Sequence, residues 1–97
     1  MMAKNSDIED LVIQKIKQLR TERNISQSAL SDILGISNGQ IGNIESPRYQ
    51  HKYTLKQIYT FCTFIEFPFE KIFLTDKELA SSDNVKILIE KIIEYEE

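Results

Sequence analysis

Apolar residues recur along the chain at the three-and-four spacing of a helical face, and this pattern predicts a series of short helices. Residues 6–9, from serine to glutamate, form a capping box that marks the beginning of the first helix, and we expect its end near residues 23–24. Its apolar positions are Ile8, Leu11, Val12, Ile16 and Leu19. Its cations, which we expect on the solvated faces, are Lys15, Lys17 and Arg20.

A second, shorter helix is predicted from Gln27 to Leu34. Ser26 is a suitable N-cap residue, because its hydroxyl can accept a hydrogen bond from a free amide of the first turn. Gly35 follows directly, as glycine does where a helix ends in a left-handed residue. The apolar side chains of this helix are Ala29, Leu30, Ile33 and Leu34.

The four residues from Ser37 to Gln40 are compatible with two structures. An Asn-Gly pair between apolar residues is a strong signal for a tight β-hairpin turn. The same residues form a Ser-x-x-Gln capping box, which begins a helix. A hairpin requires alternating residues on both sides, whereas the flanks here are a glycine-capped helix and a segment with Ile41 and Ile44 three residues apart. We therefore expect a third helix after Ser37.

The rest of the chain predicts a fourth and a fifth helix and then a separate C-terminal segment. Thr54 begins another capping box, and its helix is expected to end at residues 66–68. Pro68 at a first helical position predicts a short helix to about Leu74, and Thr75 could cap a turn after it. The inward positions of the fourth helix are Leu55, Ile58, Tyr59, Cys62 and Ile65. An amphipathic terminal helix is predicted from its apolar residues Val85, Leu88, Ile89, Ile92 and Ile93. The pattern predicts an all-α protein, with a five-helix domain at residues 1–74 and a helical extension at residues 75–97.

Charge is divided unevenly along the chain. The 97 residues are 41% hydrophobic and 28% charged, which suits a single small domain with a net charge of -3. Residues 11–60 carry seven cations against three carboxylates, whereas residues 61–97 carry nine carboxylates against four lysines. The division predicts one surface that faces an anion and another that faces away from it. We expect no membrane span and no signal peptide, and hence a cytoplasmic protein.

The reactive side chains do not form the sets that catalysis or metal binding requires. His51 and Cys62 are the only residues of their types, and no glycine-rich phosphate loop follows a strand. Cys62 lies in an apolar run, where we expect a small buried thiol. The sequence therefore predicts that the protein is not an enzyme and holds neither a metal nor a cofactor.

All of the glycine in the chain is found at Gly35, Gly39 and Gly42. Gly35 serves the turn between two helices. The other two are expected on the outward face of the third helix, opposite its isoleucines, together with Asn38 and Asn43. Because each glycine inside a helix costs about 1 kcal/mol relative to alanine, this face is expected to have a use that requires close approach of the backbone.

The segment from Gln27 to Ser46, QSALSDILGISNGQIGNIES, resembles the helix-turn-helix motif of the lambda-repressor-like family, also called the XRE family. The resemblance is carried by the first glutamine, the apolar residue at position 30, the turn glycine at 35 and the apolar residues at 41 and 44. It extends over about residues 6–74 and implies a domain that binds double-stranded DNA. The chain departs from the family at Ser31, usually alanine, whose hydroxyl can bond back to its own helix, and at Glu66, usually glycine.

The outward face of the third helix is the predicted base-reading surface, because a helix fits the major groove when its neighbour crosses behind it. Asparagine offers a donor and an acceptor that match the edge of adenine. The predicted base-reading residues are Ser37, Asn38, Gly39, Gln40, Gly42 and Asn43. The predicted phosphate contacts are Gln27, by resemblance, and the loop residues Arg48, Tyr49, Lys52 and Tyr53.

We expect a transcriptional regulator, acting as a repressor and as a homodimer on a palindromic site. The terminal helix is the candidate dimer contact, and folding back onto its own core is the alternative. The aromatic residues near it are Phe61, Phe64, Phe67, Phe69 and Phe73. Two other functions stay open: an antitoxin whose acidic tail binds a partner protein, and an interaction module that has lost DNA binding.

Overall fold

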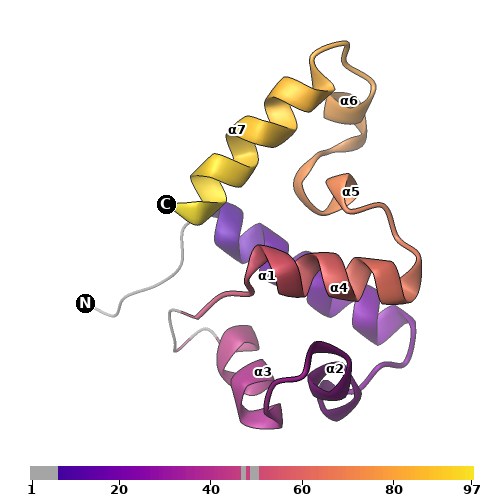
Figure 1. Cartoon of the computed structure of the whole chain (residues 1–97), viewed down its shortest axis with the longest axis vertical. Helices are drawn as coiled ribbons and strands as arrows, with labels where there is room; N and C mark the ends of the chain where they lie inside the picture. Colours follow the sequence, from indigo (N-terminus) through magenta and orange to yellow (C-terminus); the bar gives the residue numbers. More distant parts are fainter. Residues whose placement is uncertain (1–6, 47, 49–50) are drawn as a thin grey trace.

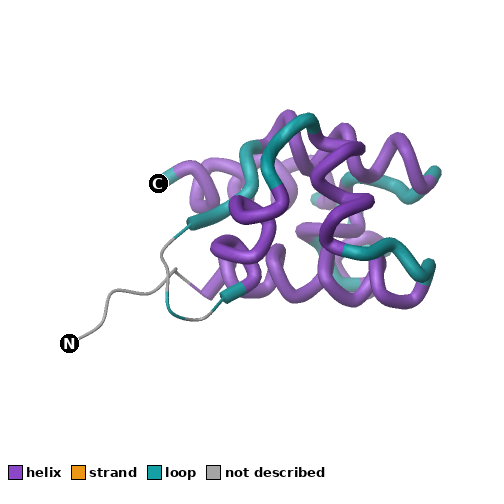
Figure 2. Tube along the Cα trace, turned by 90° about the horizontal axis from the view of Figure 1, so that it is seen from below, coloured by secondary structure: helices purple, strands orange, loops and turns teal. Residues whose placement is uncertain are grey.

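The computed structural model describes residues 7–46, 48 and 51–97, and this part of the chain is helical without any strand. The predicted all-α class is therefore confirmed, and the hairpin alternative at residues 37–40 is excluded (Figures 1 and 2). The helices are α1 (Asp7–Glu22), α2 (Gln27–Leu34), α3 (Asn38–Glu45), α4 (Leu55–Ile65), α5 (Glu70–Phe73), α6 (Asp76–Leu79) and α7 (Asn84–Glu96).

Helix α1 forms the centre of the packing. It contacts α3 at one end of the molecule and α5 and α7 at the other, while α2 packs against both α3 and α4. In Figure 1, α2 and α3 therefore lie at one end of the longest axis and α7 lies toward the other. Fully buried aliphatic and aromatic side chains from four of these helices form the core: Val12, Ile16, Leu30, Ile41, Ile58 and Phe61.

The predicted beginnings of α2, α3 and α4 and the predicted cap at Thr75 are confirmed by hydrogen bonds. The hydroxyls of Ser26, Ser37, Thr54 and Thr75 each accept a hydrogen bond from the amide three residues on, and the last three of these residues form complete capping boxes. Gly35 ends α2 at a φ of 69°, in the left-handed region that glycine adopts without strain. The capping box expected at residues 6–9 begins at a residue outside the described part.

Two departures from the family pattern are accommodated in the structure. The Ser31 hydroxyl donates to the Ser28 main-chain oxygen at 2.6 Å, as expected for a serine that bonds back to its own helix. Glu66 adopts a φ of 56° and ends α4 in the left-handed conformation, although it has a side chain. The corner after α4 therefore keeps the shape that glycine would favour.

Two expectations about which side chains point inward are wrong, and one helix begins later than predicted. Leu11 is 67% exposed and Ile13 is buried in its place. The reason is that α3, α5 and α7 all contact α1. The buried face of α1 is therefore centred on Val12, and Leu11 lies outside this face. Tyr59 is 60% exposed and its ring leans on Phe69, with centroids 6.1 Å apart. Helix α5 also begins at residue 70, two residues after the predicted proline.

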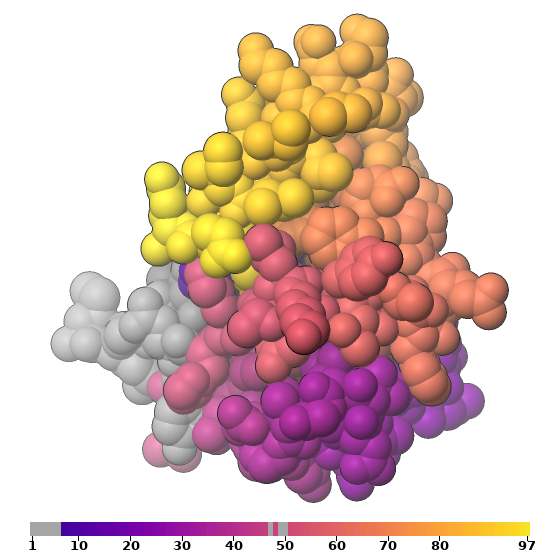
Figure 3. Space-filling model, in the orientation of Figure 1, coloured from indigo at the N-terminus to yellow at the C-terminus, as the bar shows by residue number. Residues whose placement is uncertain are grey.

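Helix α7 folds back onto the rest of the chain through one face. Tyr95 is fully buried there, donates its hydroxyl hydrogen to the Tyr53 main-chain oxygen and meets the Phe73 ring edge-on, with centroids 5.7 Å apart. Leu88 and Ile92 pack beside it. Figure 3 shows α7 covering the upper part of the molecule. The domain boundary after residue 74 stays a prediction.

Candidate nucleic-acid interface

Helix α3 is held by one face and presents the other to solvent. Ile41 and Ile44 are buried against the core, whereas Asn38, Gly39 and Asn43 are exposed. No side-chain hydrogen bond engages the amides of Asn38 and Asn43 within the described residues. The two amide groups are therefore available on the face that the sequence assigned to base reading.

Ser37 and Gln40 fix the beginning of α3. The Ser37 hydroxyl accepts from the Gln40 amide at 3.1 Å, and the Gln40 side-chain oxygen accepts from the Ser37 amide at 3.0 Å. Both residues are exposed, but these polar atoms are engaged within the cap. Their first role is thus to position the first turn of α3, and any role in base reading is additional.

The two glycines inside α3 are not required by packing. A Cβ atom added at Gly39 would find the Ser37 hydroxyl oxygen as its nearest neighbour, at 3.9 Å, and one added at Gly42 would lie 3.8 Å from the Gln27 side-chain oxygen. Both are ordinary contact distances. Gly39 is exposed as expected, whereas Gly42 is half-buried beside the first residue of α2. Gly39 therefore leaves the outward face open, and packing explains neither glycine.

A buried ion pair joins α1 to α3. Arg20 donates from Nε and Nη2 to the two carboxylate oxygens of Glu45, at 2.7 and 2.6 Å, and from Nη1 to the Ile25 main-chain oxygen at 3.0 Å. Both side chains are almost completely buried, so the expectation that Arg20 lies on a solvated face is wrong. Burial disfavours the charged Glu45 carboxylate, but the hydrogen bonds from Arg20 and Gln27 outweigh this and lower its pKa.

Gln27 belongs to the same network. Its side-chain nitrogen donates to Glu45 at 3.0 Å, so the side chain is already engaged with a carboxylate. The main-chain amide of Gln27 is at the first position of α2, where helix amides have no partner within the helix. The predicted phosphate contact therefore fits the main chain of this residue better than its side chain.

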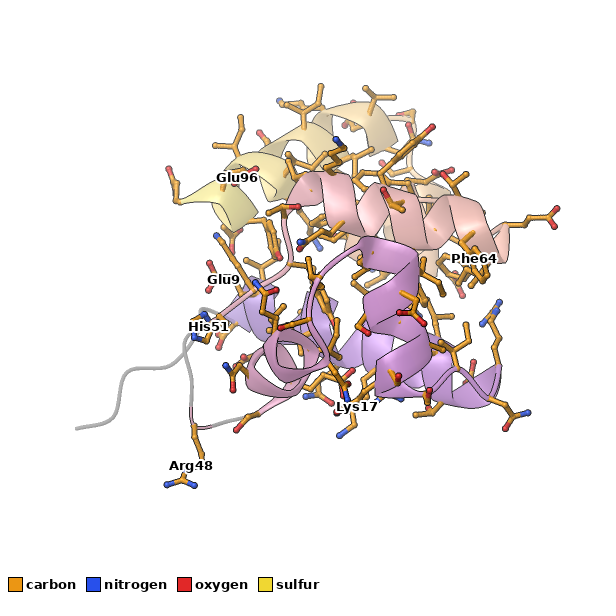
Figure 4. All side chains as sticks on the ribbon, turned by 60° about the horizontal axis from the view of Figure 1, so that its bottom comes forward. Glu9, Lys17, Arg48, His51, Phe64 and Glu96 are labelled. Carbon is orange, nitrogen blue, oxygen red and sulfur yellow. The ribbon has the colours of Figure 1, made fainter. Side chains whose placement is uncertain are left out.

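The loop before α4 contains the other predicted phosphate contacts, and their side chains have different surroundings in the structure. Arg48 is exposed and points away from the helices in Figure 4, whereas Tyr49 lies outside the described residues. Lys52 donates to Glu9 at 2.8 Å and to the Tyr95 main-chain oxygen, and its ammonium lies 4.7 Å from the centre of the Tyr95 ring. This side chain holds α7 in place, which corrects its assignment to phosphate.

Tyr53 is also wrongly assigned, because it is only 1% exposed and a phosphate could not reach it. Its hydroxyl has no hydrogen-bond partner within the described residues, and burial raises its pKa. No local pattern indicates this burial, since a tyrosine among cations is equally typical of an exposed loop. Lys17 is exposed, as expected for a cation on a solvated helix face.

Comparison with protein-family models matches residues 13–78 to a helix-turn-helix domain. The chain belongs to this helix-turn-helix family. The curated proteins and the solved structures gave no match. Within the helix-turn-helix domain, α2 and α3 are the two helices of the motif, and the residues between them form its turn. Membership supports DNA as the partner of the protein.

The helix-turn-helix protein has no other evident reactive centre within its described residues. Cys62 is buried as predicted, and burial raises the pKa of its thiol to about 11, which makes it a poor nucleophile. No group of three His, Cys, Asp or Glu side chains among the described residues could hold a metal ion. None of the helices in that part of the chain is both long and apolar enough to cross a membrane.

Proposed function

We propose that the protein is a sequence-specific transcriptional regulator that acts as a repressor and binds a palindromic site as a dimer. The observation that carries the proposal is the outward face of α3. It combines two free asparagine amides with an exposed glycine, Gly39, that the packing does not require. A face built for solubility would favour charged side chains and alanine, which are better helix formers than glycine.

In the proposed complex, α3 lies in the major groove. Asn38 and Asn43 each offer a donor and an acceptor to the edge of an adenine, and Gly39 lets the helix backbone approach the base pairs. Arg48, Lys17 and the main-chain amide of Gln27 hold the neighbouring phosphates. These contacts fix the position of the helix, whereas the asparagines select the sequence.

Two copies are proposed because one recognition helix reads only a few base pairs. A two-fold dimer places two such helices on the same side of the duplex, about 34 Å apart, so that it reads two half-sites about one helical turn apart. Recognition of both half-sites by one dimer increases the length of sequence that is selected and accounts for the palindromic symmetry of the proposed site.

Selection of bound duplexes from a random DNA pool at about 0.15 M salt tests the proposal, because nonspecific electrostatic binding is weakened there. We expect a two-fold symmetric site. The variant with Asn38→Ala and Asn43→Ala should lose the sequence preference, whereas Lys86→Ala on α7 is the matched control and should keep it. A pool without enrichment, or an unchanged preference in the double variant, would contradict the assignment.

An antitoxin is the second candidate function, favoured by the acidity of residues 61–97, with nine carboxylates against four lysines. In this role the domain would also bind a basic partner protein through its C-terminal part. A small toxin gene beside its own gene and a stable complex between the two proteins are the expected signs. An unenriched DNA pool together with a tight protein complex would favour an interaction module that has lost DNA binding.

A further inference from the structure

Helix α7 has more apolar surface than the single chain buries. Its inner face packs through Leu88, Ile92 and the fully buried Tyr95. On the outer side, Val85, Ile89 and Ile93 are 65%, 52% and 55% exposed, and we call these three residues the α7 stripe. A helix that is apolar on both sides is typical of a position between two layers of protein. One layer is the protein's own core, and the other is missing from a single chain.

Neither the fold nor the proposed DNA contact explains the α7 stripe. The helices that contact α7 are α1, α5 and α6, and it lies at the opposite end of the molecule from α2 and α3 (Figures 1 and 3). The helix is also firmly placed. Lys52 donates to the Tyr95 main-chain oxygen, and Lys91 donates to Glu78 at 2.9 Å and to the Phe73 main-chain oxygen at 3.3 Å. The stripe is therefore a fixed surface that points away from the core.

We propose that the α7 stripe is the surface through which a second copy of this chain binds, so that two stripes pack against each other around a two-fold axis. The inference rests on the proposed function, which needs two copies on one site. The stripe contains no charged residue, so it is complementary to itself. Its residues are four positions apart, and ridges of this spacing interlock in the commonest class of helix packing. Pairing at α7 leaves α3 uncovered in both copies.

The other exposed apolar patch does not fit as the partner of the stripe. It lies on α2 and α4 and consists of the exposed Tyr59 and Phe64 beside the half-buried Ile33. If the stripe of one copy bound this patch of another, the contact would be heterologous and would continue into open chains unless it closed into a ring. Pairing of like surfaces closes after two copies, which is the assembly that a palindromic site requires.

The size of the α7 stripe predicts a weak dimer. Three half-exposed side chains in each copy are far fewer than the roughly 20–30 residues on each side of a standard interface. We therefore expect a dissociation constant in the micromolar range or weaker for the free protein. DNA that carries both half-sites would then assemble the dimer, because each copy is held in place by its own half-site.

Sedimentation of the full chain between about 1 and 500 µM tests the surface. We expect a monomer–dimer equilibrium, and Ile89→Glu should raise the dissociation constant of the dimer at least tenfold. Ile93→Lys is a second variant with the same expected effect. Circular dichroism shows whether each variant folds. Phe64→Glu introduces the same charge into the other apolar patch and is the matched control, with an unchanged equilibrium expected. Three outcomes would overturn the proposal. They are a dimer that Phe64→Glu disrupts, an assembly larger than two copies, and a monomer at every concentration both with and without operator DNA.

Single cysteines at positions 85, 89 and 93 locate the two-fold axis. The native Cys62 is buried, so an introduced thiol is the reactive one in each variant. We expect fast disulfide formation between copies for at least one of the three and none for Thr63→Cys on α4; absence of a crosslink at all three positions would contradict the assignment. Specific DNA binding by a dimer that the α7 variants leave intact would refute this surface alone, whereas a dimer without sequence preference would refute the proposed function alone.

Discussion

Replacing both glycines of α3 by alanine should make the protein more stable and weaken its binding to DNA. Gly39 and Gly42 are inside the helix, where alanine is favoured over glycine by about 1 kcal/mol per residue. The added Cβ atoms would lie 3.9 and 3.8 Å from their nearest neighbours, so no steric penalty offsets the gain. We expect the free energy of unfolding to rise by about 2 kcal/mol in the double variant. For a domain of this length, such a gain raises Tm by about 8–16 °C.

The two effects are measured separately. Urea unfolding followed by circular dichroism gives the free energy of unfolding, and fluorescence anisotropy with a labelled operator duplex gives the affinity. The methyl group at the exposed position 39 would keep the backbone of α3 away from the base edges, so we expect the affinity for the operator to fall on the order of tenfold. The matched control is Gly35→Ala, where the φ of 69° makes a side chain unfavourable by about 1–2 kcal/mol.

Each result has a clear consequence for the reasoning. A double variant that is stabilised but binds DNA as before would refute the placement of this face against the groove. A double variant that is not stabilised would refute the conclusion that packing does not require the two glycines. Destabilisation by Gly35→Ala is expected in either case, because its turn conformation is a local property of the backbone.

Three further changes test the core and the corners of the fold, each by urea unfolding. Arg20→Met should reduce the free energy of unfolding by about 3–5 kcal/mol, because it leaves the buried Glu45 carboxylate unpaired. Folding lowers the pKa of Glu45, so the ion pair stabilises the protein fully above the pKa of unfolded glutamate. This stabilisation should disappear as the pH falls through the pKa of Glu45 in the folded protein. Arg20→Met should not show this loss, because it lacks the ion pair. Tyr53→Phe should leave stability unchanged or raise it by about 1 kcal/mol, because the lost hydroxyl is buried without a partner within the described residues. Glu66→Gly should stabilise by about 1 kcal/mol, because φ is 56° there.

Helix boundaries were predictable because caps act within a few residues. Each of Ser37, Thr54 and Thr75 makes its capping bonds with the residue three positions on, so the signal and its structure occupy the same short window. The same holds for Gly35, whose left-handed conformation is a local property. The helix-turn-helix motif, which is built from these local features, could therefore be predicted without knowledge of the core.

Contacts between distant residues were not predictable in this way. Arg20 and Glu45 are 25 residues apart, and nothing in the spacing around Arg20 distinguishes a buried arginine from a solvated one. Lys52 and Tyr53 were assigned to DNA because they lie among cations, but Tyr95, 42 residues beyond Tyr53, accounts for their orientation. A pattern along the sequence reports the periodicity of one helix, whereas burial depends on which other helices cover it.

The ion pairs of the fold also limit how the protein can bind DNA. Arg20 and Lys52, two of the seven cations of the basic middle segment, are engaged by Glu45 and Glu9, so much of the apparent positive charge there is neutralised internally. Lys17 and Arg48, two exposed cations that Figure 4 labels, are the side chains proposed to contact phosphates. With two such phosphate contacts in each copy of a dimer, the slope of log K against log salt should be about −3.6. Operator binding measured by anisotropy between about 0.05 and 0.3 M salt gives this slope. A much steeper slope would mean that further cations reach the phosphates, whereas a slope near half this value would indicate that a single copy binds.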